Sequence, residues 1–180
     1  TLDRSSAASD VYKRQGKIRA IEKGSYDGDL EVLDAKGHHI LPGFIDIHIH
    51  GGYGEDAMDA SYDGLKHLAE QLLSEGTTSF LATTMTQSQE AIDKALKNIR
   101  TYYEQQDREN AAEIAGVHLE GPFISENKIG AQNPAFIQRP TVALLQQFQE
   151  TAKGLIKIVT IAPEVAGATE VIDTLKDDII

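Results

Sequence analysis

The sequence predicts an α/β fold in which parallel strands alternate with helices, as in the first four βα units of a (β/α)8 barrel. Four segments rich in β-branched and apolar residues alternate with segments whose apolar residues recur at helical spacing. Each predicted strand also has polar residues at its carboxyl end, the face on which (β/α)8 barrels carry their active sites.

Length and composition favour a globular protein that acts on a small molecule. The chain has 180 residues, of which 41% are hydrophobic, and a formal net charge of -11. That charge disfavours nucleic acid and anionic membranes as partners. There is no cysteine, so a metal would be held by His, Asp, Glu or water. No apolar run approaches the roughly 20 residues of a membrane span and no signal peptide is evident, so we expect a cytoplasmic protein.

The first forty residues differ from the rest of the chain. Residues 1–15 show no periodicity and no core-forming run, so we expect them to be disordered or foreign to the fold. Short strands are predicted at Gly16–Ile21 and Leu30–Leu33, joined by a glycine-containing turn.

The first main strand lies within Pro42–Gly54. Two sets of residues alternate along it, the apolar Ile45, Ile47 and Ile49 and the polar Asp46, His48 and His50. Because strand side chains alternate between faces, the isoleucines should face a covering layer, and both histidines the opposite side. Two imidazoles at the end of such a strand can converge on one ion of zinc, iron, nickel or copper. The alternative, two solvated histidines beside a turn, is disfavoured by the aspartate in phase with them.

Three further strands and four helices follow in alternation. The strands are predicted at Thr77–Thr84, Glu113–Phe123 and Leu155–Ala162, and the helices at Ser61–Glu75, from Ser88 to about Gln106, from Thr141 and from Thr169. Ser88 and Thr141 are expected to cap their helices, and Gly76 to end the first one. The buried face of the second helix is predicted to hold Ala91, Ile92, Ala95, Leu96, Ile99 and Tyr103.

The third strand ends in the motif GVHLEGPF. Glu120 sits at the end of this strand, level with His50, and a carboxylate beside two histidines makes a mixed nitrogen and oxygen site for a divalent metal. We therefore predict that His48, His50 and Glu120 bind metal. The alternative for Glu120 is a solvated or lysine-paired strand end. His118 is predicted to be a hydrogen-bonded interior residue, and Asp46 is a candidate acceptor for a ligand histidine.

Two motifs carry a resemblance to a known family. PGFIDIHIHGG resembles the first-strand signature of the amidohydrolase superfamily, and GVHLEGPF followed by KIGAQNP is similar to the N-acetylglucosamine-6-phosphate deacetylase family in particular. The first motif is general to the superfamily, whereas the second pair is far more specific. Family members have a distorted (β/α)8 barrel and a small β-sandwich built from both chain ends. The resemblance thus implies that residues 16–40 are part of the sandwich and residues 41–180 the N-terminal half of the barrel.

The resemblance also implies an activity and the residues that support it. The family hydrolyses the acetamide of N-acetylglucosamine 6-phosphate, giving glucosamine 6-phosphate and acetate. Glu120 matches its principal metal ligand, and His48 and His50 match a pair associated with a second metal, so one or two divalent ions, zinc or iron, are expected. Ala131 and Gln132 match positions that contact the sugar phosphate.

The same resemblance places the family's catalytic aspartate and its later metal histidines beyond residue 180. We therefore expect no catalytic residue within this chain and no useful turnover from the chain alone. The expected partner is an amino-sugar phosphate, and the full-length protein is expected to form a homodimer.

Two other interpretations remain open. One is a different amidohydrolase that acts on a cyclic amide or ureide, although many of those use a carboxylated lysine where this chain has Glu120. The other is an inactive fragment that only binds metal or another molecule.

Overall fold

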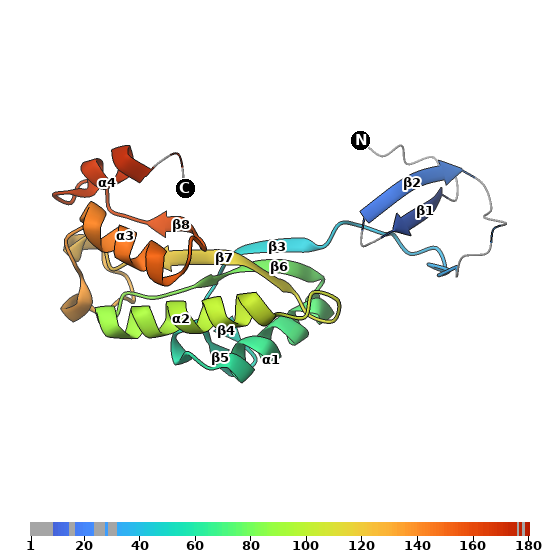
Figure 1. Ribbon diagram of the computed structural model, residues 1–180, viewed down its shortest axis with the longest axis horizontal. Coiled ribbons are helices and arrows are strands. Elements are labelled where there is room, and N and C mark those ends of the chain that lie inside the picture. The colour runs from blue at the N-terminus through green and yellow to red at the C-terminus, as the bar shows by residue number, and fades with distance from the viewer. Residues whose placement is uncertain (1–8, 15–16, 24–27, 29–31, 176, 178) are drawn as a thin grey trace. The chain divides into compact units, whose positions relative to one another are not determined.

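The computed structural model describes residues 9–14, 17–23, 28, 32–175, 177 and 179–180. The chain forms two compact units, residues 1–41 and residues 42–180, which are described separately. The first unit holds a hairpin in which β1 (Ser9–Arg14) pairs antiparallel with β2 (Lys17–Lys23) (Figure 1).

The hairpin places Ser9–Arg14, part of the segment predicted to be disordered or foreign to the fold, in a strand, while a foreign origin of residues 1–15 stays a prediction. Val11 pairs with Ile21 across the hairpin, and a β-branched residue on each strand favours the extended backbone. Residues 1–8 and 15 lie outside the described residues. So do residues 30 and 31 of the predicted strand Leu30–Leu33, while Val32 and Leu33 lie outside any strand. That this region belongs to a β-sandwich stays a prediction.

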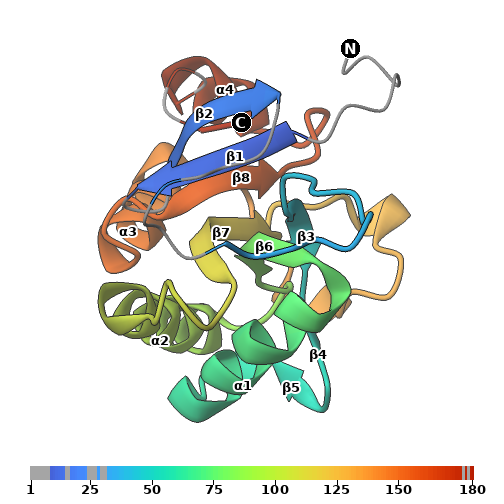
Figure 2. The ribbon, with the colours of Figure 1, turned by 90° about the vertical axis from the view of Figure 1, so that its right-hand side faces the viewer.

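The second unit is built on a parallel sheet with the strand order β3-β6-β7-β8 (Figure 2). Its strands are β3 (Phe44–Ile49), β6 (Thr77–Thr83), β7 (Glu113–Glu120) and β8 (Ile156–Thr160). A small hairpin follows β3, made of β4 (Gly51–Gly52) and β5 (Glu55–Asp56). Because all four main strands run the same way, their carboxyl ends meet at one edge of the sheet.

Four helices connect or follow these strands, each successive pair in contact. They are α1 (Tyr62–Leu72), α2 (Gln89–Gln105), α3 (Val142–Thr151) and α4 (Ala168–Leu175), with short 3-10 turns η1 (Ala57–Asp59), η2 (Leu73–Glu75), η3 (Glu126–Lys128) and η4 (Pro134–Phe136). The hydroxyls of Ser88 and Thr141 accept backbone N–H bonds at the starts of α2 and α3, as predicted. Gly76 ends η2 with a φ of 83°, which confirms it as the stop after α1.

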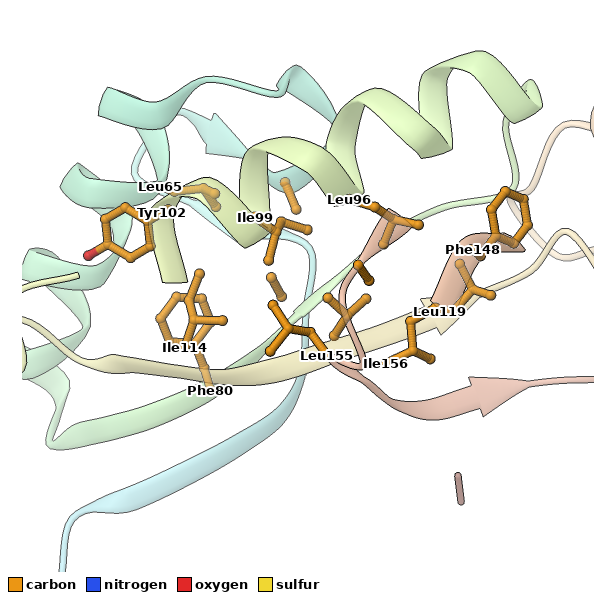
Figure 3. Packing of buried hydrophobic residues seen from close by; sticks show 14 of the residues in the cluster. Leu65, Phe80, Leu96, Ile99, Tyr102, Ile114, Leu119, Phe148, Leu155 and Ile156 are labelled. Atoms are coloured by element: carbon orange, nitrogen blue, oxygen red, sulfur yellow. The ribbon is translucent and has the colours of Figure 1, made fainter. Parts of the chain in front are cut away.

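The hydrophobic core lies between the helices and the sheet. Figure 3 shows side chains of α2 facing side chains of the strands, and this core includes Leu96, Ile99, Tyr102, Phe80, Ile114, Leu119 and Ile156, all 1% exposed or less. The helices thus pack against one face of the sheet. This packing holds the carboxyl ends of the strands in fixed register.

Three details of the predicted core are wrong. Ala91, predicted on the buried face of α2, is only half-buried. Tyr102, not Tyr103, is the buried tyrosine of α2, while Tyr103 only packs against the edge of the core. Ile45 and Ile47 are 68% and 57% exposed. The covering layer expected over these two side chains is therefore not formed by the described residues.

The predicted α/β class is confirmed, while closure into a (β/α)8 barrel stays a prediction. Three strands are shorter than predicted. β6 ends at Thr83, one residue early. β7 ends at Glu120 because Pro122 offers no backbone N–H to a ladder. β8 ends at Thr160. Among the described residues, no helix is long and apolar enough to span a membrane.

Candidate metal centre

Three side chains meet at the carboxyl ends of β3 and β7. His48 lies in β3, His50 directly follows it, and Glu120 is the last residue of β7. One ligand atom from each of the three lies within 4.8 Å of the others. The structure therefore brings together the three residues that the sequence predicts as metal ligands. Their role as ligands stays a prediction.

The ring of His50 is oriented by strand β6. Its Nδ1 lies 3.2 Å from the carbonyl oxygen of Thr83. A carbonyl oxygen can only accept, so this nitrogen carries the proton of a neutral ring and donates it. In a neutral ring Nε2 is then bare, and it lies 2.9 Å from Oε2 of Glu120. A backbone carbonyl is a typical second partner for a histidine that binds metal.

Oε2 of Glu120 is buried and has no hydrogen-bond partner, although His50 Nε2 is so close. With a neutral His50 ring, two lone-pair atoms face each other here. Buried carboxylate oxygens without a partner are costly. A cation held between the two atoms would satisfy both.

His48 is the third member of the group. Its Nε2 lies 3.9 Å from Glu120 Oε2, and its Nδ1 lies 3.3 Å from Nδ1 of His118. Asp46 accepts a hydrogen bond from the backbone N–H of His48, at 2.9 Å. Asp46 thus fixes the backbone at His48, and the ring contact expected of Asp46 is made by His118.

His118 is the hydrogen-bonded interior residue that the sequence predicts. It is 8% exposed, its Nδ1 lies 3.1 Å from the carbonyl oxygen of Ile47, and its Nε2 lies 2.8 Å from Oγ1 of Thr160. Burial lowers the pKa of His118, an effect larger than the opposing influence of the Ile47 carbonyl. The ring is therefore neutral at pH 7.

The donor set fits a divalent ion. Zinc ligands bind at about 2.0–2.2 Å, so two ligands of one ion are separated by about 4.4 Å at most. The three ligand atoms lie within 4.8 Å, so a small contraction brings them around a single ion. Two imidazoles and a carboxylate suit zinc and iron among the common biological metals.

The loop after β7 lies against the end of β6. Oε1 of Gln132 accepts a hydrogen bond from the backbone N–H of Thr86, at 2.8 Å. Gly121 starts this loop with a φ of 78°, and a Cβ at that position would collide with Oγ1 of Thr86. Gln132 is half-buried, whereas Ala131, the other predicted substrate contact, is exposed.

Two residues contact the site's histidines although the sequence assigned them no role there. The Thr83 carbonyl orients His50, and Thr160 holds His118. Both residues are polar and end a strand, which is a signal for proximity to the site. A backbone carbonyl has no sequence signature, however, so the role of Thr83 requires the tertiary structure.

A profile of the amidohydrolase family matches residues 39–175. The chain belongs to the amidohydrolase family. Within this family it is similar to N-acetylglucosamine-6-phosphate deacetylase of Bacillus subtilis, with 50% identity over 168 residues that cover 92% of this chain and 42% of that protein. The enzyme of the same name from Lysinibacillus sphaericus is 38% identical and is covered over 43% of its length.

Similar solved structures carry the same enzyme name as these relatives. N-acetylglucosamine-6-phosphate deacetylase from Thermotoga maritima superposes with a TM-score of 0.74 at 33% identity, covering 94% of this chain and 42% of that one. The enzyme from Pasteurella multocida gives a TM-score of 0.79 at 30% identity, covering 91% and 42%. The chain thus spans about two fifths of the length of the amidohydrolases it matches.

Proposed function

We propose that this chain carries the metal-binding part of an enzyme that hydrolyses the acetamide of N-acetylglucosamine 6-phosphate to glucosamine 6-phosphate and acetate. The observation that carries the proposal is the buried Oε2 of Glu120, which makes no hydrogen bond and faces His48 and His50 at the carboxyl ends of parallel strands. The shared name of the relatives supports the choice of substrate.

In this proposal Glu120, His48 and His50 hold one or two divalent ions, zinc or iron. A bound divalent ion would polarise an amide carbonyl and lower the pKa of its water to about 7. The protein's own part is orientation. The Thr83 carbonyl holds the His50 ring with Nε2 toward Glu120, and Asp46 fixes the backbone that carries His48.

Gln132 supplies a donor for the substrate. Its Oε1 is occupied by the N–H of Thr86, so its amide N–H groups are the part that remains to bind a ligand. Phosphate and sugar hydroxyl oxygens accept hydrogen bonds, so they can bind the amide N–H groups of Gln132. Together with the exposed Ala131, Gln132 is proposed to position the sugar phosphate.

The experiment measures acetate released from N-acetylglucosamine 6-phosphate by the complete protein loaded with zinc or iron. Glu120→Gln should abolish both metal binding and acetate release, because the amide keeps the size of the side chain but loses its charge. Glu164→Gln is the matched control, since Glu164 also follows a strand but is exposed. Full activity and metal content in Glu120→Gln would contradict the proposal. Hydrolysis of a cyclic imide without acetate release would instead favour a different amidohydrolase.

A further inference from the structure

The two ring nitrogens of His118 face partners with different hydrogen-bonding abilities. Nδ1 lies 3.1 Å from the Ile47 carbonyl oxygen and 3.3 Å from Nδ1 of His48, while Nε2 lies 2.8 Å from the Thr160 hydroxyl. A carbonyl only accepts, a hydroxyl donates or accepts, and a neutral imidazole has one N–H and one bare nitrogen. The proton positions on His48 and His118 are therefore linked.

Without metal, the Ile47 carbonyl determines the arrangement. A bare Nδ1 on His118 would point a lone pair at that carbonyl, so Nδ1 carries the proton and Nε2 accepts from Thr160. Nδ1 of His48 then faces an N–H and can only accept. The proton of His48 is consequently on Nε2, the nitrogen that lies 3.9 Å from Glu120.

When Nε2 of His48 binds a divalent ion, the arrangement must reverse. Nε2 has to be bare to act as a ligand, so the proton of His48 moves to Nδ1 and needs an acceptor. The neighbouring acceptor is Nδ1 of His118, which must then be bare. His118 carries its proton on Nε2 and donates it to Thr160, whose hydroxyl changes from donor to acceptor. Each ring carries one proton in both states, so the pair neither gains nor loses a proton.

We propose that His118 is a positioning residue for the metal ligand His48 and that its tautomer changes from Nδ1–H to Nε2–H when metal binds. This inference rests on the proposed metal site. The packing supports it: the two rings are nearly perpendicular at 83°, with centroids 4.8 Å apart, and His118 is buried. The ring can therefore accept a new proton contact from His48 by exchanging tautomers in place, giving up its hydrogen bond to the Ile47 carbonyl and gaining one from Nδ1–H of His48.

A direct test follows the tautomer itself. Long-range proton–nitrogen correlation spectra of isotope-labelled histidine distinguish protonated from bare ring nitrogens. Spectra of the complete protein are recorded without metal and with saturating zinc, which is diamagnetic. We expect the proton of His118 on Nδ1 without zinc and on Nε2 with zinc. Tight zinc binding with an unchanged His118 tautomer would overturn this inference and leave the metal site standing, whereas failure to bind zinc would remove the metal site and this inference with it.

Two substitutions test the positioning role through zinc affinity. His118→Leu removes the acceptor for Nδ1–H of His48, and loss of such a partner typically weakens metal binding by about 10–100-fold. His118→Asn keeps an oxygen near the position of Nδ1 and should restore the affinity to within about threefold of the original protein, well inside that loss. His67→Leu, a change at an exposed histidine of α1, is the control and should change nothing. Equal zinc affinity in His118→Leu and the unmodified protein would also overturn the inference.

Discussion

Nε2 of His50 and Oε2 of Glu120 lie 2.9 Å apart, yet no hydrogen bond satisfies the buried carboxylate oxygen. The Thr83 carbonyl accepts a hydrogen bond from Nδ1–H of His50, so in a neutral ring both facing atoms present lone pairs. The fold holds these two atoms close together, and local conflicts of this kind are typical of functional sites.

Glu120→Gln should therefore have opposite effects on stability and on metal binding. In metal-free protein the new amide N–H can donate to His50, so the free energy of unfolding should rise by about 1 kcal/mol. Zinc affinity should fall sharply. Urea unfolding in the presence of a chelator measures the first effect, with Glu164→Gln as the control. A less stable Glu120→Gln protein would indicate that His50 is protonated and forms an ion pair with the carboxylate.

Gln132→Glu should separate the two roles of Gln132. A glutamate oxygen can still accept from the Thr86 N–H, so the loop stays attached to β6. The new carboxylate donates nothing and repels phosphate, so KM for the sugar phosphate should rise by about tenfold or more, given about 1.5–3 kcal/mol for a hydrogen bond to a charged group. Steady-state kinetics of the complete protein measure this change. An unchanged KM would show that Gln132 does not contact the substrate.

Tyr102→Phe should leave the fold at least as stable as before. Tyr102 is 1% exposed and its hydroxyl is buried without a hydrogen-bond partner, so removing the oxygen removes an unsatisfied group that costs about 1–3 kcal/mol. Denaturant midpoints near pH 8 measure the effect. A loss of more than about 1 kcal/mol would reveal a hydrogen bond of normal strength at this hydroxyl.

The same tyrosine predicts a pH dependence. Burial raises the pKa of Tyr102 from 10.0 to about 12, so the folded protein keeps the hydroxyl protonated where the unfolded chain ionises. This contribution to stability is complete below pH 10 and is lost as the pH rises towards 12. Tyr102→Phe should therefore lose less stability between these two pH values. Equal alkaline losses in the two proteins would show that another group controls the transition.

Two isoleucines should respond differently to truncation. Ile114 is fully buried in β7, so Ile114→Ala should cost about 2–5 kcal/mol of unfolding free energy. Ile45 of β3 is 68% exposed, so Ile45→Ala should cost about 0.5 kcal/mol or less in the protein described by this structure. Urea unfolding of both variants makes the comparison. A large cost at Ile45 in the complete protein would show that another segment covers this face of β3.

The order of strands and helices was predictable from the sequence because both follow from local periodicity. Ser88, Thr141 and Gly76 were identified as helix boundaries because capping chemistry involves only neighbouring residues. The choice between Tyr102 and Tyr103 failed because adjacent positions differ by only about 100° around a helix, and the packing partner decides which of them is buried.

The candidate metal site also has features that the sequence determines and features that only the tertiary structure determines. Alternation along β3 and the position of Glu120 at the end of β7 determine that the three predicted ligands share a face and a level, since strand phase is a property of the local backbone. The partners of the rings were decided only by tertiary structure: His118 contacts the carbonyl of Ile47 across 71 positions of sequence, and His50 contacts that of Thr83 across 33. Every residue has a backbone carbonyl, so only the register of neighbouring strands determines which one a histidine meets.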